Sequence, residues 1–391
     1  MNASVTDLLR DHPVIDGHND LLWALRHRHN YDFDAVDIGE RQDGLVHTDL
    51  PRLREGGVGA QFWSVYVPST MGPEAVGATL EQVDAAYRMI ERYADRMALA
   101  TTADEVEAAW ADGRVASLLG AEGGHQIDGS LAVLRMYHRL GVRYLTLTHN
   151  DNVAWADSAT DDRVLGGLNE VGRGVVAEMN RLGMMVDISH VSDGTMDDVL
   201  RISEAPVIFS HSSARALADH RRNVPDSILT RLAKNGGVVM VNIYPGFINA
   251  TAAKQAANVL DKEREFKAMY PNDPDKSAKA FTDFLSTFKT ETGTLEEVAD
   301  HIDYIRKVAG IDHVGIGADF GSLTQHPTGL DDVSRYPYLT AELIRRGYTD
   351  SEVKKVLGLN ILRVMREVER AAVRIQRTRG PSTATIEELR Q

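Results

Sequence analysis

Short apolar runs of β-strand character alternate along the whole chain with longer stretches of helical character. The expected strands are Val14–Asp16, Gly59–Val67, Val115–Gly120, Tyr144–Thr148, Met184–Ile188, Val207–Ser210, Gly237–Asn242 and Val314–Gly317. The expected helices are Leu80–Ala98, Ser130–Leu140, Glu170–Leu182, Asp193–Ile202, Pro225–Lys234 and Leu295–Ala309. Strand–helix alternation repeated in this way is typical of a parallel (β/α)8 barrel, the TIM barrel. The sequence therefore predicts an α/β fold with a single barrel domain over residues 1–391.

Several of these runs end in a side chain that can bind a metal ion. Val14 and Ile15 lead into a segment with His18 and Asp20, and the strand that starts at Val115 leads into Glu122. His190 and His211 follow two later strands in the same manner. A doubly wound open sheet is the competing α/β layout. The barrel is favoured because polar strand ends recur along the whole chain, whereas an open sheet gathers them at one crossover.

The chemistry of these residues indicates a two-metal hydrolytic site. The chain has no cysteine, so a transition metal must be held by imidazole and carboxylate groups. His18 and Asp20 are two apart on an extended segment and should point to the same side. The same alternation places His190 on one face with Val186 and Ile188, and His211 on one face with Val207 and Phe209. We expect these faces to be the barrel interior. Glu122 offers two oxygens, enough to bridge two ions that activate a shared hydroxide.

Each of these side chains alone is more often a structural residue than a ligand. A single histidine after a strand is commonly hydrogen-bonded within the protein, and a single glutamate before two glycines is commonly part of a turn. The recurrence of such residues at four strand ends favours the metal site.

Further polar residues belong to the same expected rim. Asp319 follows the last strand, where a carboxylate beside an activated water can act as general base and then as general acid. His149 follows the fourth strand and could polarise a carbonyl and hold an oxyanion. Arg221 and Arg222 lie after the sixth strand, and an arginine there could bind a substrate carboxylate. Spacing alone does not choose between the two arginines.

The overall charge limits the partners and the location. A net charge of −14 argues against nucleic acid and against anionic membrane surfaces as partners. The first residues lack the pattern of a secretory signal, and no apolar run approaches the ~18 residues of a membrane span. We therefore expect a cytoplasmic protein without a membrane partner.

Two segments fall outside the strand–helix repeat. Residues 246–292, between the seventh and eighth expected strands, form a charged helical insertion with helices at Ala252–Met269 and Ser277–Lys289. This insertion is either a lid or dimer contact, or a solvated excursion without a role. Residues 370–391 are expected to form a polar, loosely held tail.

From about residue 14 to residue 369 the chain resembles the membrane dipeptidase (renal dipeptidase) family of zinc metallopeptidases, which are amidohydrolase-type barrels. The matching segments are 14–20, 122–125, 144–150, 187–192, 209–213, 221–226 and 314–320. The resemblance implies a binuclear zinc site with one Zn²⁺ at His18, Asp20 and Glu122, and a second at Glu122, His190 and His211.

The resemblance also implies roles for the remaining rim residues. His149 and Asp319 would flank the scissile amide, and Arg222 would anchor the terminal carboxylate of a dipeptide. A homodimer is suggested by the resemblance alone. The insertion 246–292 is longer than in compact members of the family, so pocket closure and specificity are open.

Together these observations predict a zinc-dependent dipeptidase that cleaves free dipeptides through a hydroxide bridging two ions. Acceptance of a D-residue at the C-terminal position is left open. One alternative is another binuclear-metal amide or lactone hydrolase on the same barrel, with a different substrate clamp. The second is a metal-stabilised binding protein without catalysis, which would have no need of Asp319.

Overall fold

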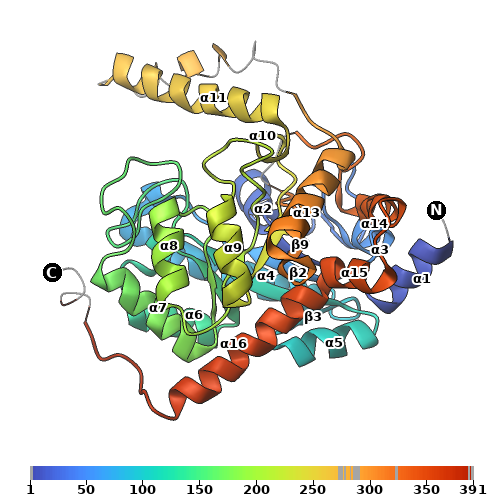
Figure 1. Ribbon diagram of the computed structural model, residues 1–391, viewed down its shortest axis with the longest axis horizontal. Helices are drawn as coiled ribbons and strands as arrows, with labels where there is room; N and C mark the ends of the chain where they lie inside the picture. Colours follow the sequence, from blue (N-terminus) through green and yellow to red (C-terminus); the bar gives the residue numbers. More distant parts are fainter. Residues whose placement is uncertain are drawn as a thin grey trace.

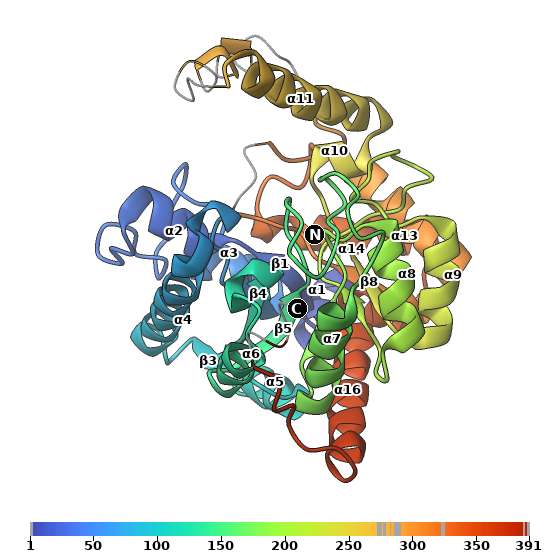
Figure 2. The ribbon, with the colours of Figure 1, turned by 90° about the vertical axis from the view of Figure 1, so that its left-hand side faces the viewer.

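A closed barrel of eight parallel strands forms the centre of the molecule (Figures 1 and 2). The computed structural model describes residues 3–271, 276, 279–281, 283–284, 291–321, 325–385 and 388. The barrel strands run in the order β2-β1-β9-β8-β7-β6-β5-β4, and β2 pairs with β4 to close the ring. Their bounds are β1 Val14–Asn19, β2 Val58–Ser64, β4 Val115–Glu122, β5 Val142–Thr146, β6 Met185–Asp187, β7 Ile208–Phe209, β8 Val238–Val241 and β9 Val314–Ile316. The prediction of a (β/α)8 barrel is confirmed.

A ninth strand, β3 (Met97–Leu99), was not predicted. The expected helix Leu80–Ala98 ends earlier, because α4 spans Ala75–Arg92. Ala116 of β4 pairs with β2 on one edge and with β3 on the other. Three residues are too few to show the alternation of a strand, so the helical pattern before them was extended in error.

The helices surround the barrel, and their ends follow local capping signals. Their bounds are α1 Ala3–Asp11, α2 Leu21–His29, α3 Leu50–Glu55, α5 Ala103–Ala111, α6 Leu131–Arg139, α7 Glu170–Leu182, α8 Asp193–Ile202, α9 Asp226–Asn235, α10 Pro245–Ile248, α11 Ala250–Met269, α13 Leu295–Ala309, α14 Tyr336–Arg345, α15 Asp350–Lys354 and α16 Asn360–Gln376. Helix α13 begins where predicted because Thr294 and Glu297 form a capping box. Helix α7 ends where predicted because Gly183 adopts the left-handed conformation.

Two apolar layers hold the barrel together. One buried cluster fills the barrel interior and one of its ends. It includes Phe62, Leu118, Tyr144, Met185 and Met240. A second cluster lies between strands and helices, and it includes Val186, Ile188, Val207 and Phe209. The expectation that these last four side chains face the barrel interior is therefore wrong.

The insertion lies between β8 and β9, the seventh and eighth barrel strands, as predicted. Helix α11 extends away from the barrel (Figures 1 and 2), while Ala252 and Ala253 at its start are buried. The second expected helical stretch, Ser277–Lys289, lies largely outside the described residues.

The polar tail begins later than residue 370. Helix α16 continues to Gln376, and Ala371, Ala372 and Ile375 are buried. These residues continue the apolar stripe of Val364 and Val368 at helical spacing, and the charged residues between them hid that pattern.

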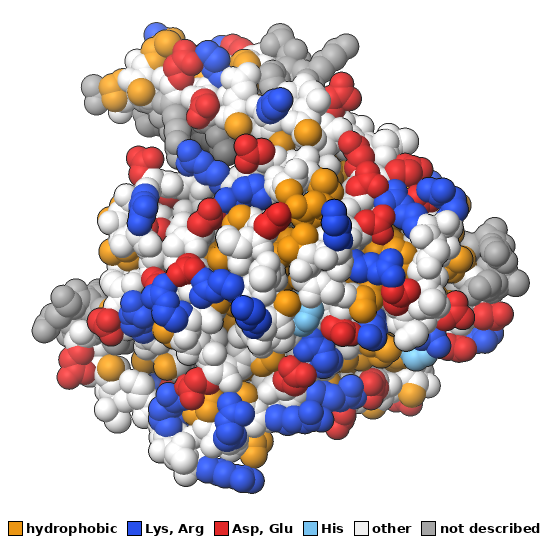
Figure 3. All heavy atoms as spheres, viewed as in Figure 1, with side chains coloured by type: hydrophobic (Ala, Val, Ile, Leu, Met, Phe, Trp, Pro, Cys, Tyr) orange, Lys and Arg blue, Asp and Glu red, His pale blue; other side chains and the backbone are white. Residues whose placement is uncertain are grey.

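No helix that the structure describes combines the length and the apolar character needed to cross a bilayer. On the face shown in Figure 3, basic and acidic side chains are interspersed.

Candidate active site

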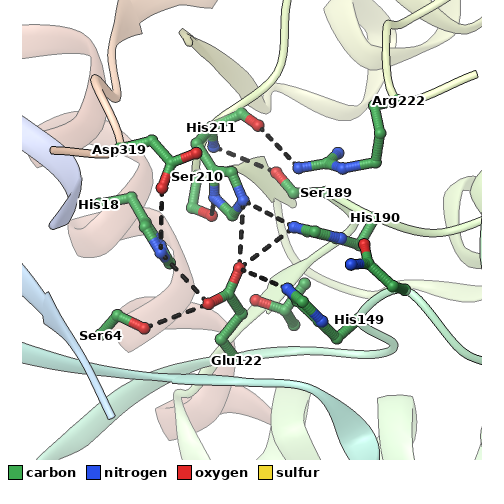
Figure 4. A network of polar contacts seen from close by, with 12 residues as sticks. His18, Ser64, Glu122, His149, Ser189, His190, Ser210, His211, Arg222 and Asp319 are labelled. Carbon is green, nitrogen blue, oxygen red and sulfur yellow. Dashed lines mark hydrogen bonds and ion pairs between the residues drawn. The ribbon is translucent and has the colours of Figure 1, made fainter. Parts of the chain in front are cut away.

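The side chains predicted at the strand ends meet at one mouth of the barrel (Figure 4). They come from the carboxyl ends of six strands: His18, Asp20, Glu122, His149, His190, His211 and Asp319. These side chains are buried: all except His149 are less than a tenth exposed. The barrel therefore gathers residues that are up to three hundred positions apart in the chain.

The carboxylate of Glu122 lies between two groups of possible ligand atoms. Its Oε2 is 3.4 Å from Nε2 of His18. Its Oε1 is 3.1 Å from Nε2 of His190 and 3.3 Å from Nε2 of His211. Glu122 faces inward because it continues the alternation of Leu118 and Gly120 along β4.

A second acidic group lies on the His18 side. Nε2 of His18 is 3.5 Å from Oδ1 of Asp20 and 4.0 Å from Oδ1 of Asp319. Both His18 Nε2 and Asp20 Oδ1 are buried and lack a hydrogen-bond partner among the described residues. Buried polar atoms without a partner are costly, and a cation bound between them would satisfy both. The donor set thus fits divalent metal ions.

Polar side chains of the barrel interior form a floor under this site. Asp187 accepts hydrogen bonds from the hydroxyls of Thr146 and Ser210, at 2.5 and 2.6 Å. Ser210 in turn lies 2.7 Å from Nδ1 of His211. This chain of bonds leaves Nε2 of His211 as the lone-pair nitrogen that faces Glu122.

His18 has a corresponding partner in Tyr144. The Tyr144 hydroxyl lies 2.8 Å from Nδ1 of His18 and donates to the carbonyl of Gly17 at 3.3 Å. Sequence reasoning did not assign roles to Tyr144, Asp187 or Ser210. A signal was present, because polar residues within otherwise apolar strands are buried only where they find partners.

The backbone, rather than strand alternation, turns two of the side chains into the site. Strand β6 ends at Asp187, before His190, and His190 has a φ of 65°. Asp319 has a φ of 69°. The left-handed region is uncommon for residues other than glycine, and such residues concentrate at functional sites.

Asp319 is positioned by its neighbours at the end of β8 and β9. Nδ2 of Asn242 donates to its Oδ2 at 3.1 Å. Burial, followed by the negative charge of Asp20, raises the pKa of Asp319 well above its usual range. Asn242 was not predicted as a site residue.

Arg222 is buried beside the candidate metal ligands. It donates from Nη1 to the Ser212 hydroxyl and from Nη2 to the carbonyl of His211, both at 3.3 Å. Among the described residues no carboxylate lies within ion-pair distance of Arg222. Burial lowers its pKa to about 10, so the guanidinium remains charged at neutral pH. Arg221, by contrast, is exposed, so the fold distinguishes two arginines that spacing could not.

A cavity of about 400 Å³ opens above the candidate metal ligands. Asp20, Glu122, His149, Arg222 and Asp319 line it. The His149 ring packs between Tyr66 and His190, with ring centroids 4.6 and 4.4 Å away. Burial lowers the pKa of His149, which favours the neutral imidazole.

The barrel, the carboxylate between two groups of possible ligands and the cavity define a metal-dependent hydrolase of the TIM-barrel type. Residues 2–379 match the model of the family described as membrane dipeptidase (peptidase family M19). The chain belongs to this family, whose members are metallo-dipeptidases that hydrolyse peptide bonds.

Individual relatives agree with this assignment. Dipeptidase verJ of Clonostachys rogersoniana is 42% identical over 383 residues, which cover 95% of this chain and 88% of the relative. The probable dipeptidase PvdM from Pseudomonas aeruginosa has 25% identity and a TM-score of 0.78, covering 94% of this chain and 98% of that one. A metallo peptidase from Rhodobacter sphaeroides, liganded with a phosphinate mimic of the dipeptide L-Ala-D-Ala, has 27% identity and a TM-score of 0.75, covering 91% and 99%.

Proposed function

We propose that this dipeptidase hydrolyses free dipeptides with two zinc ions held at the mouth of the barrel. The supporting observation is the position of Glu122, whose two oxygens face His18 on one side and His190 and His211 on the other. His18 and Asp20 would hold one ion, His190 and His211 the other, and Glu122 would bridge them. When bound, the ions supply a nucleophilic hydroxide and polarise the scissile carbonyl.

Asp319 would move the proton in this reaction. Its Oδ1 accepts the proton of the attacking nucleophile and then delivers it to the amide nitrogen as the C–N bond breaks. The bond from Asn242 to Oδ2 supports this role, because it leaves Oδ1 on the side of His18.

His149 would hold the carbonyl oxygen of the scissile amide. Its Nε2 lies 3.8 Å from Oε1 of Glu122, at the edge of the cavity. A nitrogen donor at this place stabilises the negative charge that develops on that oxygen during attack.

Arg222 would bind the C-terminal carboxylate of the dipeptide. A buried guanidinium that has no carboxylate partner in the described part of the chain favours an anion from the substrate. The clamp limits the substrate to one residue beyond the scissile bond. Because a solved relative is liganded with a mimic of L-Ala-D-Ala, we also propose that this chain accepts a D-residue at the C-terminal position.

The test is hydrolysis of a panel of L,L and L,D dipeptides by zinc-loaded protein, with zinc content measured on the same sample. We expect two zinc ions per chain and cleavage of free dipeptides, but not of their C-terminal amides. Equal cleavage of the amides would contradict the role of Arg222, and no cleavage at all would contradict the substrate class.

The cytoplasmic location and the homodimer stay proposals from the sequence. Sedimentation of the purified protein tests the dimer, which a monomer at micromolar concentration would contradict.

A further inference from the structure

We infer that the insertion between β8 and β9 builds an apolar subsite for the side chain of the substrate's C-terminal residue. The enzyme would then prefer dipeptides that end in an apolar residue over those that end in glycine or in an acidic residue. This inference rests on the proposed dipeptide hydrolysis and names the substrate class of the same site.

The insertion supplies one wall of the cavity above the metal-binding residues. Phe247 of α10 and Ala256 and Val259 of α11 line the cavity together with Arg222 and Asp319. Ala252, Ala256 and Val259 follow each other at intervals of four and three residues, so they share one face of α11. That face is apolar from the buried start of the helix to the half-buried Val259.

The position of Arg222 decides which part of a dipeptide meets this wall. The Arg222 guanidinium lies 5.1 Å from the centroid of the Phe247 ring. A carboxylate bound by Arg222 therefore lies beside Phe247. Because the C-terminal side chain branches one carbon away from that carboxylate, it is the group closest to Phe247, Ala256 and Val259.

A separate aromatic pair lies beside His149. The rings of Trp23 and Tyr66 pack edge to face at 5.2 Å, and Tyr66 contacts His149. Both also line the cavity. The side chain of the N-terminal residue can pack against this aromatic pair. The wall built by the insertion then remains for the side chain of the C-terminal residue.

Hydrogen bonds to α13 anchor the wall. Asn249 caps α11 by accepting the N–H groups of Thr251 and Ala252, and its Nδ2 donates to Glu297 at 2.7 Å. His301 of α13 lies 3.0 Å from the carbonyl of Ile248 and accepts the N–H of Ala214, in the loop that leads to Arg222. One residue of α13 thus ties the wall to the loop of the carboxylate clamp. A preformed apolar wall selects its ligand with little ordering cost.

The wall is also uncharged where it meets the cavity. Among the described residues of the insertion, those that line it are Phe247, Ala256 and Val259, and Asp261 lines a neighbouring cavity instead. A charged side chain on the C-terminal residue would lose its hydration against this wall without gaining a hydrogen bond or an ion pair. One methylene in a hydrophobic pocket discriminates about 10- to 200-fold, so leucine should exceed glycine by at least about 10-fold in kcat/KM.

The test compares Ala–Gly, Ala–Leu, Ala–Asp and Ala–Lys in both stereochemical series, with the zinc-loaded full chain. Affinities of the phosphinate analogues of Ala–Gly and Ala–Leu are measured by calorimetry as a readout that does not need turnover. We expect Ala–Leu to exceed Ala–Gly in kcat/KM by at least about 10-fold, and its analogue to bind more tightly by a similar factor.

A pair of variants on α11 locates the effect. Val259→Asp should reduce the ratio of Ala–Leu to Ala–Gly by about 10-fold or more and raise kcat/KM for Ala–Lys. Asn258→Asp introduces the same charge one residue earlier, at an exposed position that does not line the cavity. It should leave the ratio of Ala–Leu to Ala–Gly and the kcat/KM for Ala–Lys unchanged.

The outcomes separate the subsite from the reaction. Hydrolysis with equal kcat/KM for all C-terminal residues, or an unchanged ratio in Val259→Asp, overturns the subsite and leaves the reaction standing. Graded binding of the analogues without hydrolysis supports the subsite and overturns the reaction. Neither binding nor hydrolysis overturns both.

Discussion

Asn242 donates a hydrogen bond from Nδ2 to Oδ2 of Asp319 over 3.1 Å. Asn242 is fully buried at the end of β8, so the barrel itself sets the orientation of the Asp319 carboxylate. If Asp319 transfers the proton, its orientation should matter for turnover more than for substrate binding.

Asn242→Ala should lower kcat by about 10- to 100-fold with little change in KM, because it frees the carboxylate from its productive position. Steady-state kinetics of the zinc-loaded variant measure this. The control is Asn235→Ala, since Asn235 bonds the backbone groups of Ala205 and Val207 at the other end of the barrel. An equal loss of kcat in both variants would show a structural effect and contradict the positioning role.

Asp319→Asn should keep fold and zinc content but lose turnover by about 10²- to 10⁴-fold, because the amide cannot accept the proton. Zinc analysis, thermal unfolding and kcat on one preparation check all three points. Near-normal turnover would remove Asp319 from the mechanism.

Ser210→Ala should weaken zinc binding by about 10- to 100-fold, because it breaks the bond chain from Asp187 to His211. The measurement is competition with a chelator of known zinc affinity. The control is Ser203→Ala, because the Ser203 hydroxyl bonds Asn180 and the carbonyl of Ala205, away from the site. Activity should return at saturating zinc, and unchanged retention of both ions would refute the orienting role.

Stability should fall in mild acid through His301. Burial lowers the pKa of His301 to about 4, although the Ile248 carbonyl and Asp300 oppose this shift. The folded pKa is below the unfolded value of about 6.5, so the unfolded chain binds more protons between these values. The contribution of His301 to the free energy of unfolding is therefore complete above pH 6.5 and decreases toward pH 4.

Between pH 8 and pH 5 this one group should cost about 2 kcal/mol of unfolding free energy. Urea unfolding of the wild type and of His301→Gln at both values measures the difference. The variant is expected to be less stable at pH 8 and to depend less on pH, and parallel pH profiles would argue against the neutral buried imidazole.

The barrel and most of its rim were predictable because they depend on local patterns. Apolar runs define the strands, and parallel strands bring their carboxyl ends together whatever the connecting loops do. The side chains that orient the rim were harder to predict. Tyr144 reaches His18 across the barrel, over 126 positions of sequence. A polar residue in an apolar strand indicates that a partner exists, but no local signal identifies that partner.

The inward turn of His190 was also beyond pattern reasoning. Alternation was carried past the end of β6, whereas a single left-handed residue reverses the direction of the side chain there. Which of the two adjacent arginines is buried at the site depends on the conformation of the whole loop. The two residue identities alone do not determine it.

The place of the insertion has an evolutionary consequence. The described part of the segment between β8 and β9 adds no strand to the barrel and no side chain to the candidate metal-binding groups, yet Phe247, Ala256 and Val259 line the cavity of the candidate site. Mutations in this segment can change the preferred substrate while the catalytic residues stay under unchanged selection. Related enzymes can therefore differ in substrate preference through this one insertion and still catalyse the same reaction.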